Sequence, residues 1–476
     1  MTELALIKNH PHKITLEEWD VQYRRIKKSG MKEPAYGGSL RRHADGGDLR
    51  LLKLKYDNSP AALRLWNFLL TEEERLHKAR ATGKKIIGTM KDLGTIPVMA
   101  YSMPNLVAFY PDGAWWTPCL EMSGELLGIA DSLGITESFC PVRAMLGAFV
   151  AGDRFPIPDL LVCSVGATCD DFSAIAQRLE GLGHPILWWE IPHRRYPDEG
   201  EKAIVLPGGF AVSAAQIKFV KGELDRVRNA LEKLSGYKLT DAELRLGIKS
   251  ANRVRHIIND IRSAVFMAEI CPLPALELLV AEMLAIHFCS DQNETIIVLT
   301  ELLQEITRRV KTGQGVLPAD AVKVFWVNPV ADIRVMNLLE ECGGRLCGTE
   351  YLFCHAIDHI PTDISPMEAL ARMALADPMV GSTADRAQRI CRDMREAGSE
   401  ALVISRIPGA SHCAFEGTVI GDIVKEELGV PVIEIEVPPV SDSIYPNLRT
   451  RIEALVEMAR APRKLRNARN TRKKGR

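Results

Sequence analysis

Residues 158–172 read PDLLVCSVGATCDDF, and this stretch decides the fold. Its first part, LLVCSV at 160–165, is a short continuous apolar run that predicts a strand buried on both faces, as in a parallel sheet. Cys169 follows at the carboxyl end of that strand. Ligands of open α/β sheets bind at the carboxyl ends of the strands, so the position of Cys169 favours a functional site.

Two further segments hold a cysteine in a comparable setting. ALVISR at 401–406 predicts another buried strand, SRIPGASHCAF at 405–415 places Cys413 after it, and SFCPVRAMLGAF at 138–149 contains Cys140. Thiolates from three distant segments suit a soft metal centre, and three protein ligands leave one coordination position open. The pattern alone is also compatible with a second interpretation, in which the three cysteines are packing residues of the core. The chain has no C-x-x-C pair, and a free cysteine is commonly a small buried hydrophobe.

Strand-like and helix-like segments alternate twice along the chain. The first alternation has the predicted strands KKIIGTM, NLVAFYP, LLVCSV and PILWWEIP, with SGELLGIADSLG and DDFSAIAQRLEGLG as helices. The second has AVKVFWV, ALVISR and VPVIEIEV, with helices through ADIRVMNLLEECGG and VIGDIVKEELG. Each alternation predicts a parallel sheet. The expected fold class is therefore α/β, with two doubly wound parallel-sheet halves of the Rossmann or flavodoxin-like type.

The section between these halves is predicted to be helical. In residues 215–236, apolar side chains recur every three or four positions and predict a buried stripe, and Thr240 with Glu243 predicts a capping box for the next helix. We expect a helical N-terminal arm at 1–83, a first α/β domain at 84–205, a helical connecting section at 206–318, a second α/β domain at 319–460 and a basic disordered tail at 461–476.

This division separates the three cysteines. Cys140 and Cys169 belong to the first half, and Cys413 belongs to the second. A site that uses all three would lie in the cleft between the halves, where small-molecule sites concentrate.

The composition is that of an ordinary globular protein. Of 476 residues, 46% are hydrophobic and 25% are charged, and the 60 basic residues nearly balance the 61 acidic ones. This balance gives no excess of positive charge of the kind that binds nucleic acid or a membrane surface. The first residues lack the apolar segment of a signal peptide, and no stretch has the length of a membrane span, so we expect a cytoplasmic protein with free thiols.

A pair of histidines is the second candidate metal site. CHAIDHI places His355 and His359 four residues apart, beside Cys354 and Asp358, and on one helix the two rings would share a face that suits zinc. The signature H-E-x-x-H is absent, and the segment follows a strand-like TEYLFC and precedes a proline turn. The favoured interpretation is a surface or core feature.

Three other cysteines and the C-terminal segment have simpler interpretations. Cys342 and Cys347 lie around a glycine pair that ends a helix and are predicted to be packing residues, whereas Cys119 stays unassigned. The segment APRKLRNARNTRKKGR has eight basic residues and no acidic one, and it lacks the interleaved aromatics of a base-stacking surface. We interpret it as a solvated terminus.

Familiar catalytic loops are missing from the sequence. There is no G-x-x-x-x-G-K-[ST] loop for ATP, no G-x-G-x-x-G after a strand for a nicotinamide cofactor, and no G-x-S-x-G nucleophile elbow. Analogy to dehydrogenases or hydrolases therefore has no residues to support it.

From about residue 84 to about 460, the chain resembles the 2-hydroxyacyl-CoA dehydratase and benzoyl-CoA reductase family. The resemblance rests on the order and separation of several segments: CPVRAMLGAFVAG at 140–152, PDLLVCSVGATCDDF at 158–172, WWEIP at 188–192, SHCAFEG at 411–417, GVPVIEIEV at 429–437 and RTRIEALVEM at 449–458. Subunits of that family hold an iron–sulfur cluster on three cysteines. The resemblance implies that Cys140, Cys169 and Cys413 ligate a [4Fe–4S] cluster.

The resemblance also implies an activity and partners. An ATP-dependent activator iron–sulfur protein would supply an electron of low potential, which reaches a CoA thioester and forms a ketyl radical. A homologous second subunit is expected, and the subunit described as the 2-hydroxyglutaryl-CoA dehydratase D-component is similar to this chain. The sequence does not identify a general base.

Three functions are compatible with the sequence. The SHC, IEIEV and RTRIEA segments favour a dehydratase of 2-hydroxyacyl-CoA, which is a lyase. The same cysteine frame is compatible with a benzoyl-CoA reductase-type subunit that reduces an aryl-CoA. A non-catalytic paralogue, acting as scaffold or electron relay, is disfavoured because all three cysteines are present.

Overall fold

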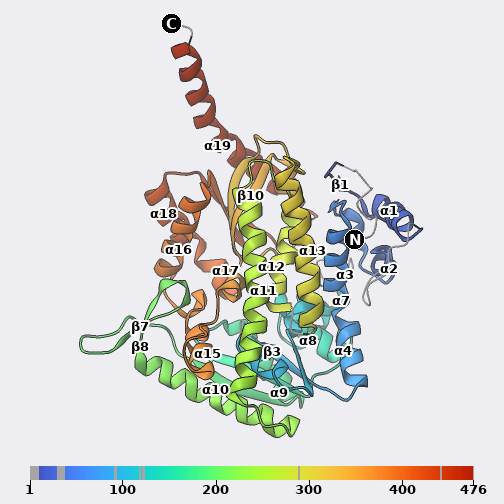
Figure 1. Cartoon of the computed structure of the whole chain (residues 1–476), viewed down its shortest axis with the longest axis vertical. Coiled ribbons are helices and arrows are strands. Elements are labelled where there is room, and N and C mark those ends of the chain that lie inside the picture. The colour runs from blue at the N-terminus through green and yellow to red at the C-terminus, as the bar shows by residue number, and fades with distance from the viewer. Residues whose placement is uncertain are drawn as a thin grey trace.

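Two four-stranded parallel sheets organise the chain (Figure 1). The computed structural model describes residues 10–28, 38–90, 94–116, 120, 124–287, 290–439 and 442–474. Helices flank both sheets, which confirms the predicted fold class of two doubly wound halves.

The first sheet contains the strands expected from the apolar runs. Its strands are β3 (Lys85–Met90), β4 (Leu106–Phe109), β5 (Leu160–Gly166) and β6 (Ile186–Ile191). The helices of this half are α5 (Ile96–Tyr101), α7 (Glu125–Ser132), α8 (Ala144–Ala151) and α9 (Asp170–Gly181), with the 3-10 turns η3 (Pro111–Trp116) and η4 (Pro141–Arg143).

The second sheet repeats this arrangement. Its strands are β9 (Val322–Val327), β10 (Gly344–Glu350), β11 (Ala401–Arg406) and β12 (Val432–Glu436). The helices of this half are α14 (Arg334–Glu341), α15 (Pro366–Leu375), α16 (Thr383–Ala397), α17 (Ser411–Phe415), α18 (Gly417–Leu428) and α19 (Tyr445–Lys474), with the 3-10 turns η6 (Phe353–Ile357) and η7 (Pro378–Val380).

Both sheets have the same strand order. In the orders β4-β3-β5-β6 and β10-β9-β11-β12, the second strand of each half lies at one edge and pairs with the first strand, and the third and fourth strands follow on the other side of the first. The second strand is added on one side of the first strand and the third strand on the other side, so the switch point of each sheet lies between its first and third strands. In open α/β sheets, ligands bind outside the carboxyl ends of the strands at this point. Cys169 follows β5 and Cys413 follows β11, so these two cysteines leave equivalent strands of the two halves.

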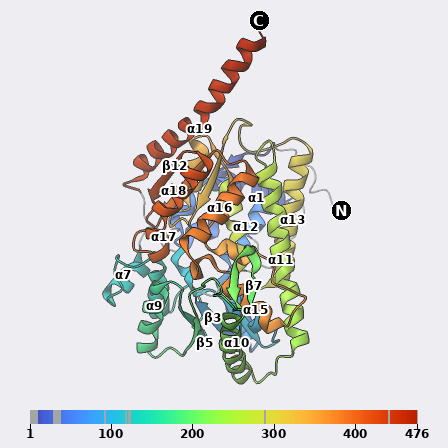
Figure 2. The ribbon, with the colours of Figure 1, turned by 90° about the vertical axis from the view of Figure 1, so that its left-hand side faces the viewer.

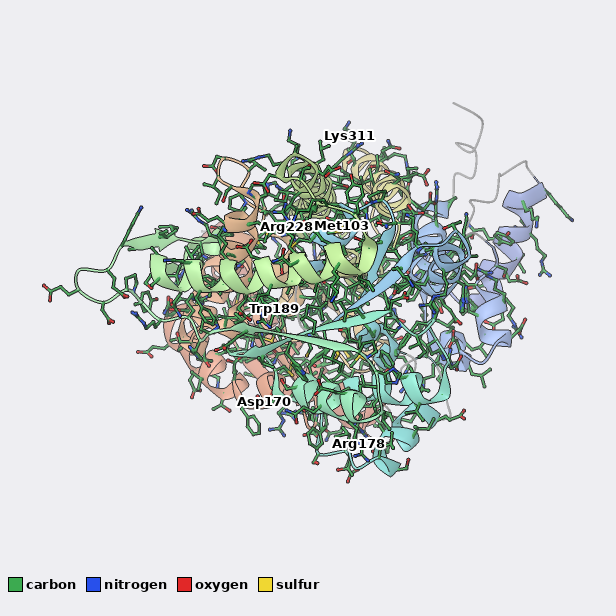
Figure 3. All side chains as sticks on the ribbon, turned by 90° about the horizontal axis from the view of Figure 1, so that it is seen from below. Met103, Asp170, Arg178, Trp189, Arg228 and Lys311 are labelled. Carbon is green, nitrogen blue, oxygen red and sulfur yellow. The ribbon has the colours of Figure 1, made fainter. Side chains whose placement is uncertain are left out.

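Helices connect the halves and cover the first sheet. The connecting helices are α10 (Ala214–Ser235), α11 (Asp241–Met267), α12 (Ala275–His287) and α13 (Gln292–Lys311), preceded by a hairpin of β7 (Ala203–Val205) and β8 (Ala211–Ser213). Figure 3 shows β6, which carries Trp189, between α10 with Arg228 and α9 with Asp170. The predicted apolar stripe of α10 is buried, and the capping box of Thr240 and Glu243 is formed at the start of α11.

The N-terminal section is helical, as predicted, and packs on the body. It contains α1 (Leu16–Lys28), α2 (Arg41–Asp45), α3 (Pro60–Leu70), α4 (Glu72–Ala81), the 3-10 turn η2 (Leu49–Lys53) and a short ladder of β1 (Lys13–Ile14) with β2 (Tyr56–Asp57). The segment 60–83 forms two helices that meet at Thr71, whose backbone is not helical (φ −112) and whose hydroxyl donates to the Asn67 carbonyl oxygen at 2.6 Å. Helix α3 lies against α12 and α13, so this section forms a wall of the body.

Two segments differ from expectation. The strand-like TEYLFC is not a strand over its length: β10 ends at Glu350, and the 3-10 turn η6 begins at Phe353. The expected disordered tail continues α19 as helix to Lys474 and projects beyond the body in Figure 1. Its Ala, Leu, Arg and Lys residues are strong helix formers, which accounts for the continuation.

Every helix in the described part of the chain is too short or too polar to cross a membrane.

A buried carboxyl group joins the N-terminal section to α12. Glu277 is fully buried, and its Oε1 accepts hydrogen bonds from the Trp66 indole at 3.0 Å and the Asp57 amide at 3.1 Å. Its Oε2 has no hydrogen-bond partner among the described residues. Burial, helped by the nearby Asp57 charge, raises the pKa of Glu277 to about 8.

This carboxyl makes the free energy of unfolding depend on pH. In the unfolded chain Glu277 loses its proton near its ordinary pKa, whereas in the folded chain it keeps the proton up to about pH 8. We therefore expect the contribution of Glu277 to stability to fall as pH rises from about 4.5 to about 8 and then to level off. Glu277→Gln should remove that part of the slope and be the more stable protein at high pH by a few kcal/mol. Urea unfolding at several pH values checks this, and parallel pH profiles for both proteins would contradict it.

Candidate metal centre

The structure brings together the three cysteine segments predicted from the sequence. Cys140 precedes η4, Cys169 caps the start of α9, and Cys413 lies in α17. Cys140 and Cys413 pack in one small apolar cluster, whose other members are Ala331, Leu352, Met379, Ile407 and Ala410. Ser411 at the start of α17 in the second half donates to Asp171 of α9 in the first half, and Figure 2 shows these two helices on the same side of the molecule. The cysteine loops therefore meet between the halves.

The carboxylate of Asp171 joins all three segments. Its Oδ1 accepts a hydrogen bond from the Cys140 amide at 3.1 Å, and its Oδ2 accepts one from the Ser411 amide at 3.2 Å. The Cys169 thiol also donates to Oδ2, at 3.4 Å. Asp171 is buried, and such charge-assisted bonds are about twice as strong as neutral ones. One side chain thus fixes the relative positions of the three loops.

A glycine permits the close approach of the Cys413 loop to the Cys140 loop. Gly409 has φ +77, and a Cβ there would lie 2.5 Å from the carbonyl oxygen of Phe139 and 2.9 Å from that of Glu137. Both the backbone conformation and the space require glycine. The backbone before Cys413 therefore packs directly on the backbone before Cys140.

Gly409→Ala is expected to separate these two loops. The added Cβ meets fixed backbone, so the substitution should cost about 1–3 kcal/mol and weaken metal retention by the chain. Gly83→Ala is the matched control, because Gly83 has a similar φ of +84 but nothing within 4 Å of an added Cβ. Urea unfolding and iron retention on a desalting column measure both effects. Equal behaviour of the two variants would show that the loops do not depend on this contact.

The thiols lie in surroundings that oppose a bare negative charge. Burial raises the pKa of Cys140 well above its usual range, and charge on Cys169 or Cys413 would raise it further. Burial likewise raises the pKa of Cys413 to about 12, against the opposite effect of the Arg386 guanidinium. A metal ion supplies the positive charge that such thiolates need, so the donor set fits a thiolate-bound metal.

Arg386, on α16, balances charge beside Cys413. Its fully buried guanidinium donates to Asn328 Oδ1 at 2.6 Å, to Glu416 Oε2 at 2.5 Å and to Glu350 Oε2 at 3.0 Å. Asn328 follows β9 with φ +71, and its amide donates to the carbonyl oxygens of Ser405 at 2.9 Å and Cys413 at 3.5 Å. Arg386 therefore links the carboxyl ends of β9 and β10 to the Cys413 segment.

The spacing of the cysteines is not that of a site for one ion. Within the described residues, no three His, Cys, Asp or Glu side chains lie close enough to hold a single metal ion. Ligands of a multi-iron cluster stand farther apart than ligands of one ion, because iron and sulfide occupy the space between them.

The histidine pair does not form a metal site. His355 is buried in η6 and lines a small polar cavity with Arg386, Arg389 and Asp358, where burial lowers its pKa to about 3. The ring of His359 instead lies 6.0 Å from that of His256. The two rings have different neighbours because η6 ends at Ile357, before His359.

The other cysteines behave largely as predicted. Cys342 is buried after α14, and Cys347 is buried in β10, where its sulfur lies 3.2 Å from the Ser399 hydroxyl. Both are packing residues. Cys119 lies outside the described residues.

Sequence reasoning missed the residues that support the cysteines. Asp171 stands two positions after Cys169, in a CDD triplet that could have been recognised as a capped helix start with a spare carboxylate. Arg386 has no such signal, because it lies on a different helix, 27 positions before Cys413 by the numbering.

Comparison with known proteins identifies the family of the chain. No curated protein matches the chain. The family described as 2-hydroxyglutaryl-CoA dehydratase, D-component, matches residues 109–459, which include Cys140, Cys169 and Cys413 and most of both halves. Because this match covers well over half of the sequence, the chain belongs to the 2-hydroxyglutaryl-CoA dehydratase D-component family.

Proposed function

We propose that this chain is the iron–sulfur subunit of a 2-hydroxyacyl-CoA dehydratase, with Cys140, Cys169 and Cys413 as ligands of a [4Fe–4S] cluster. Family membership supports the coarser statement, a dehydratase-type component that acts on an acyl-CoA together with a partner subunit. The proposal of a cluster on three cysteines is supported by one observation, that the three cysteine loops meet around the Asp171 carboxylate.

The residues of the chain would each have a defined part. When bound, a cluster on three thiolates supplies a one-electron donor and an iron with an open coordination position. Asp171 holds the three loops in register, and Arg386, which also pairs with Glu350 and Glu416, lowers the pKa of the Cys413 thiol against the larger effect of burial. Ala331, Leu352, Met379 and Ile407 exclude water from the side on which Cys140 and Cys413 pack.

Electron supply requires another protein. The sequence has no phosphate-binding loop for ATP, so we propose that an external ATP-dependent activator delivers the electron to this subunit. A homologous second subunit would complete the dehydratase.

Mass spectrometry of the product tests the proposal. The chain, its partner subunit and the activator are combined without oxygen, with ATP and a strong reductant. A 2-hydroxyacyl-CoA should lose one water and become the enoyl-CoA. Gain of two hydrogens by an aryl-CoA, with no loss of water from any hydroxyacyl-CoA, would favour a ring reductase. No turnover of either class would favour a scaffold or relay subunit.

A further inference from the structure

A residue beside the cysteine loops has a strained backbone. Within the described residues, three positions other than glycine have a positive φ, namely Arg154, Asn328 and Leu352. At Leu352 φ is 64 and ψ is −51, and the Phe353 amide donates to the Tyr351 carbonyl oxygen at 2.7 Å. This geometry is the γ-turn with positive φ, which is rare and strained and is seldom adopted by a bulky residue. The chain therefore keeps this turn at a cost in stability.

Buried aromatic side chains hold the turn from both sides. Tyr351 and Phe353 belong to the main apolar core, and their ring centroids are 5.5 Å apart. The Tyr351 hydroxyl donates to the Met336 sulfur at 3.7 Å, and the Tyr351 amide donates to the Cys354 sulfur at 3.5 Å. Strained conformations persist where the surrounding structure fixes them in this way. The packing of the two rings thus keeps the turn from relaxing.

The side chain of Leu352 does not belong to the same apolar cluster as those of its two neighbours. Tyr351 and Phe353 pack in the main core, whereas Leu352 packs in the small cluster that contains Cys413 and against which Cys140 packs. Both Leu352 and Cys413 are buried there. The strained turn therefore places one apolar side chain beside two of the three proposed ligands.

An apolar neighbour of this kind affects the electron affinity of an iron–sulfur centre. Solvent exposure is one of the factors that set the reduction potential of such a cluster. A cluster on three thiolates is negative, and the reduced form has one more negative charge than the oxidised form. Water stabilises the form with the larger charge, so a side chain that excludes water lowers the potential. A low potential is what transfer of an electron to a thioester requires.

We propose that Leu352 tunes the iron–sulfur centre: the strained turn holds its side chain beside the Cys413 and Cys140 segments, where it keeps water away and keeps the reduction potential low. This inference rests on the proposed function, since it concerns the cluster that the three cysteines are proposed to hold. It gives the strain a purpose, because strained residues concentrate at functional sites.

Two substitutions at Leu352 remove the side chain. Leu352→Ala keeps the strained backbone, whereas Leu352→Gly also relieves the strain, because glycine adopts a positive φ at no steric cost. In the full chain reconstituted without oxygen, both variants should raise the reduction potential by about 59 mV, which corresponds to a tenfold change in a one-electron equilibrium. Both should also lose iron to an added chelator about tenfold faster than the parent. A redox titration followed by EPR and the absorbance of the iron–chelator complex measure these effects.

Urea unfolding of the metal-free variants tests the strain itself. Leu352→Gly should have a folding equilibrium constant about tenfold larger than that of Leu352→Ala, because alanine at a positive φ is destabilising. At an ordinary backbone position the order would be reversed, since glycine loses more conformational freedom on folding. A less stable Leu352→Gly would overturn the assignment of strain to this turn.

Leu346→Ala is the matched control. Leu346 lies on β10 near the same turn, is buried like Leu352 and packs in the main core instead of beside the cysteines. Its alanine variant should lose stability and keep both the reduction potential and the rate of iron loss of the parent. A shift of the potential by loss of any buried leucine would thus be detected.

Each result decides the inference. A higher potential and faster iron loss in the Leu352 variants, without change in Leu346→Ala, support it, and Leu352→Gly carries the comparison if Leu352→Ala does not fold. Parent values in Leu352→Gly, or equal shifts in Leu346→Ala, overturn the role of Leu352 and leave the proposed function intact. A parent chain that holds no iron after reconstitution overturns the proposed function, and the inference falls with it.

Discussion

Cys169→Ala is expected to lower the affinity of the chain for iron by more than roughly 100-fold, beyond the 10–100-fold loss that removal of an outer support causes. The variant should still fold, because Cys169 is only partly buried, makes no capping bond to the backbone amides of α9, and has only a weak thiol bond to Asp171 Oδ2. Iron per chain after reconstitution and desalting measures the first effect, and urea unfolding of the metal-free protein measures the second.

Cys391→Ala provides the control for this result. Cys391 is fully buried in α16, within an apolar cluster that contains none of the three proposed ligands. Its alanine variant should keep its iron and lose some stability, which is the reverse of the Cys169 result. Full iron retention by Cys169→Ala would exclude Cys169 as a ligand.

Arg386→Met is expected to destabilise the chain by about 3–5 kcal/mol. Removal of the guanidinium leaves Glu350 buried and Glu416 poorly exposed without their shared cation, and an unpaired buried charge has a cost of that size. Arg386→Lys should restore part of the stability, because one ammonium group cannot reach Asn328 and both carboxylates in the same fork geometry. Chemical unfolding of the metal-free chain gives both values.

A second arginine on α16 separates this effect from a general loss of charge. Arg395 pairs with Glu427 on the surface, where removal of an ion pair costs at most about 1 kcal/mol. Arg395→Met should therefore stay close to the parent protein in stability. Similar losses for the two variants would show that the buried position of Arg386 has no special importance.

The strands that sequence reasoning predicted are those with continuous apolar runs. LLVCSV and ALVISR are β5 and β11, and both are buried in the middle of their sheets, where hydrophobic burial decides the structure. Crossover connections between parallel strands are almost always right-handed, which leaves few alternatives for the repeated strand order. The placement of Cys169 and Cys413 at carboxyl ends was predictable for the same reason.

Strand β10 shows where this reasoning fails. Its sequence GRLCGTE has no apolar run, yet every residue in it is buried. Arg345 is accommodated because its guanidinium donates to the carbonyl oxygens of Val265, at 2.8 Å, and Ala268, at 2.9 Å, at the end of α11. Gly348 leaves room for the ring of Phe325. These partners come from distant segments, so no local pattern could indicate them.

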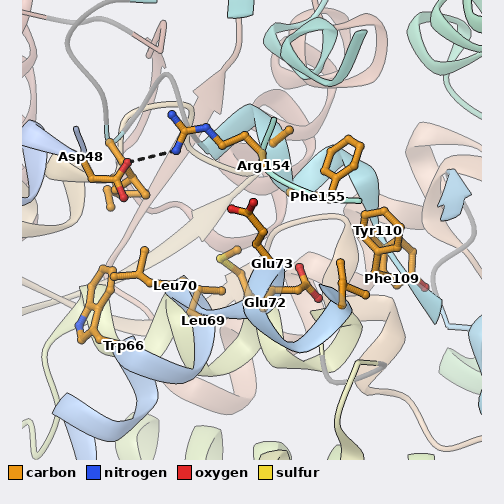
Figure 4. A pocket seen from close by; sticks show the side chains of 16 residues that line it. Asp48, Trp66, Leu69, Leu70, Glu72, Glu73, Phe109, Tyr110, Arg154 and Phe155 are labelled. Carbon is orange, nitrogen blue, oxygen red and sulfur yellow. Dashed lines mark ion pairs between the residues drawn. The ribbon is translucent and has the colours of Figure 1, made fainter. Parts of the chain in front are cut away.

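The three cysteines of the candidate site were predictable from the sequence, whereas the residues that support them were not. Cysteines after strands mark positions where a ligand can bind, and the resemblance to a family gave the set of three. Asp171 and Gly409 act through contacts between the halves, which exist only when both sheets are folded and docked. Arg386 acts through contacts with Asn328, Glu350 and Glu416 of the second half, which come from distant parts of the sequence. The pocket lined by α3 and α4 (Figure 4) likewise depends on the position of these helices over the first sheet, which tertiary packing sets.

Iron and acid-labile sulfide, measured on chain purified without oxygen, test the central claim most directly. The account predicts about four irons and about four sulfides for each chain, with an EPR signal of a reduced [4Fe–4S] cluster after addition of a reductant. Cys140→Ala, Cys169→Ala and Cys413→Ala should each lose that signal. A well-folded, colourless chain without iron after purification and reconstitution would contradict the account.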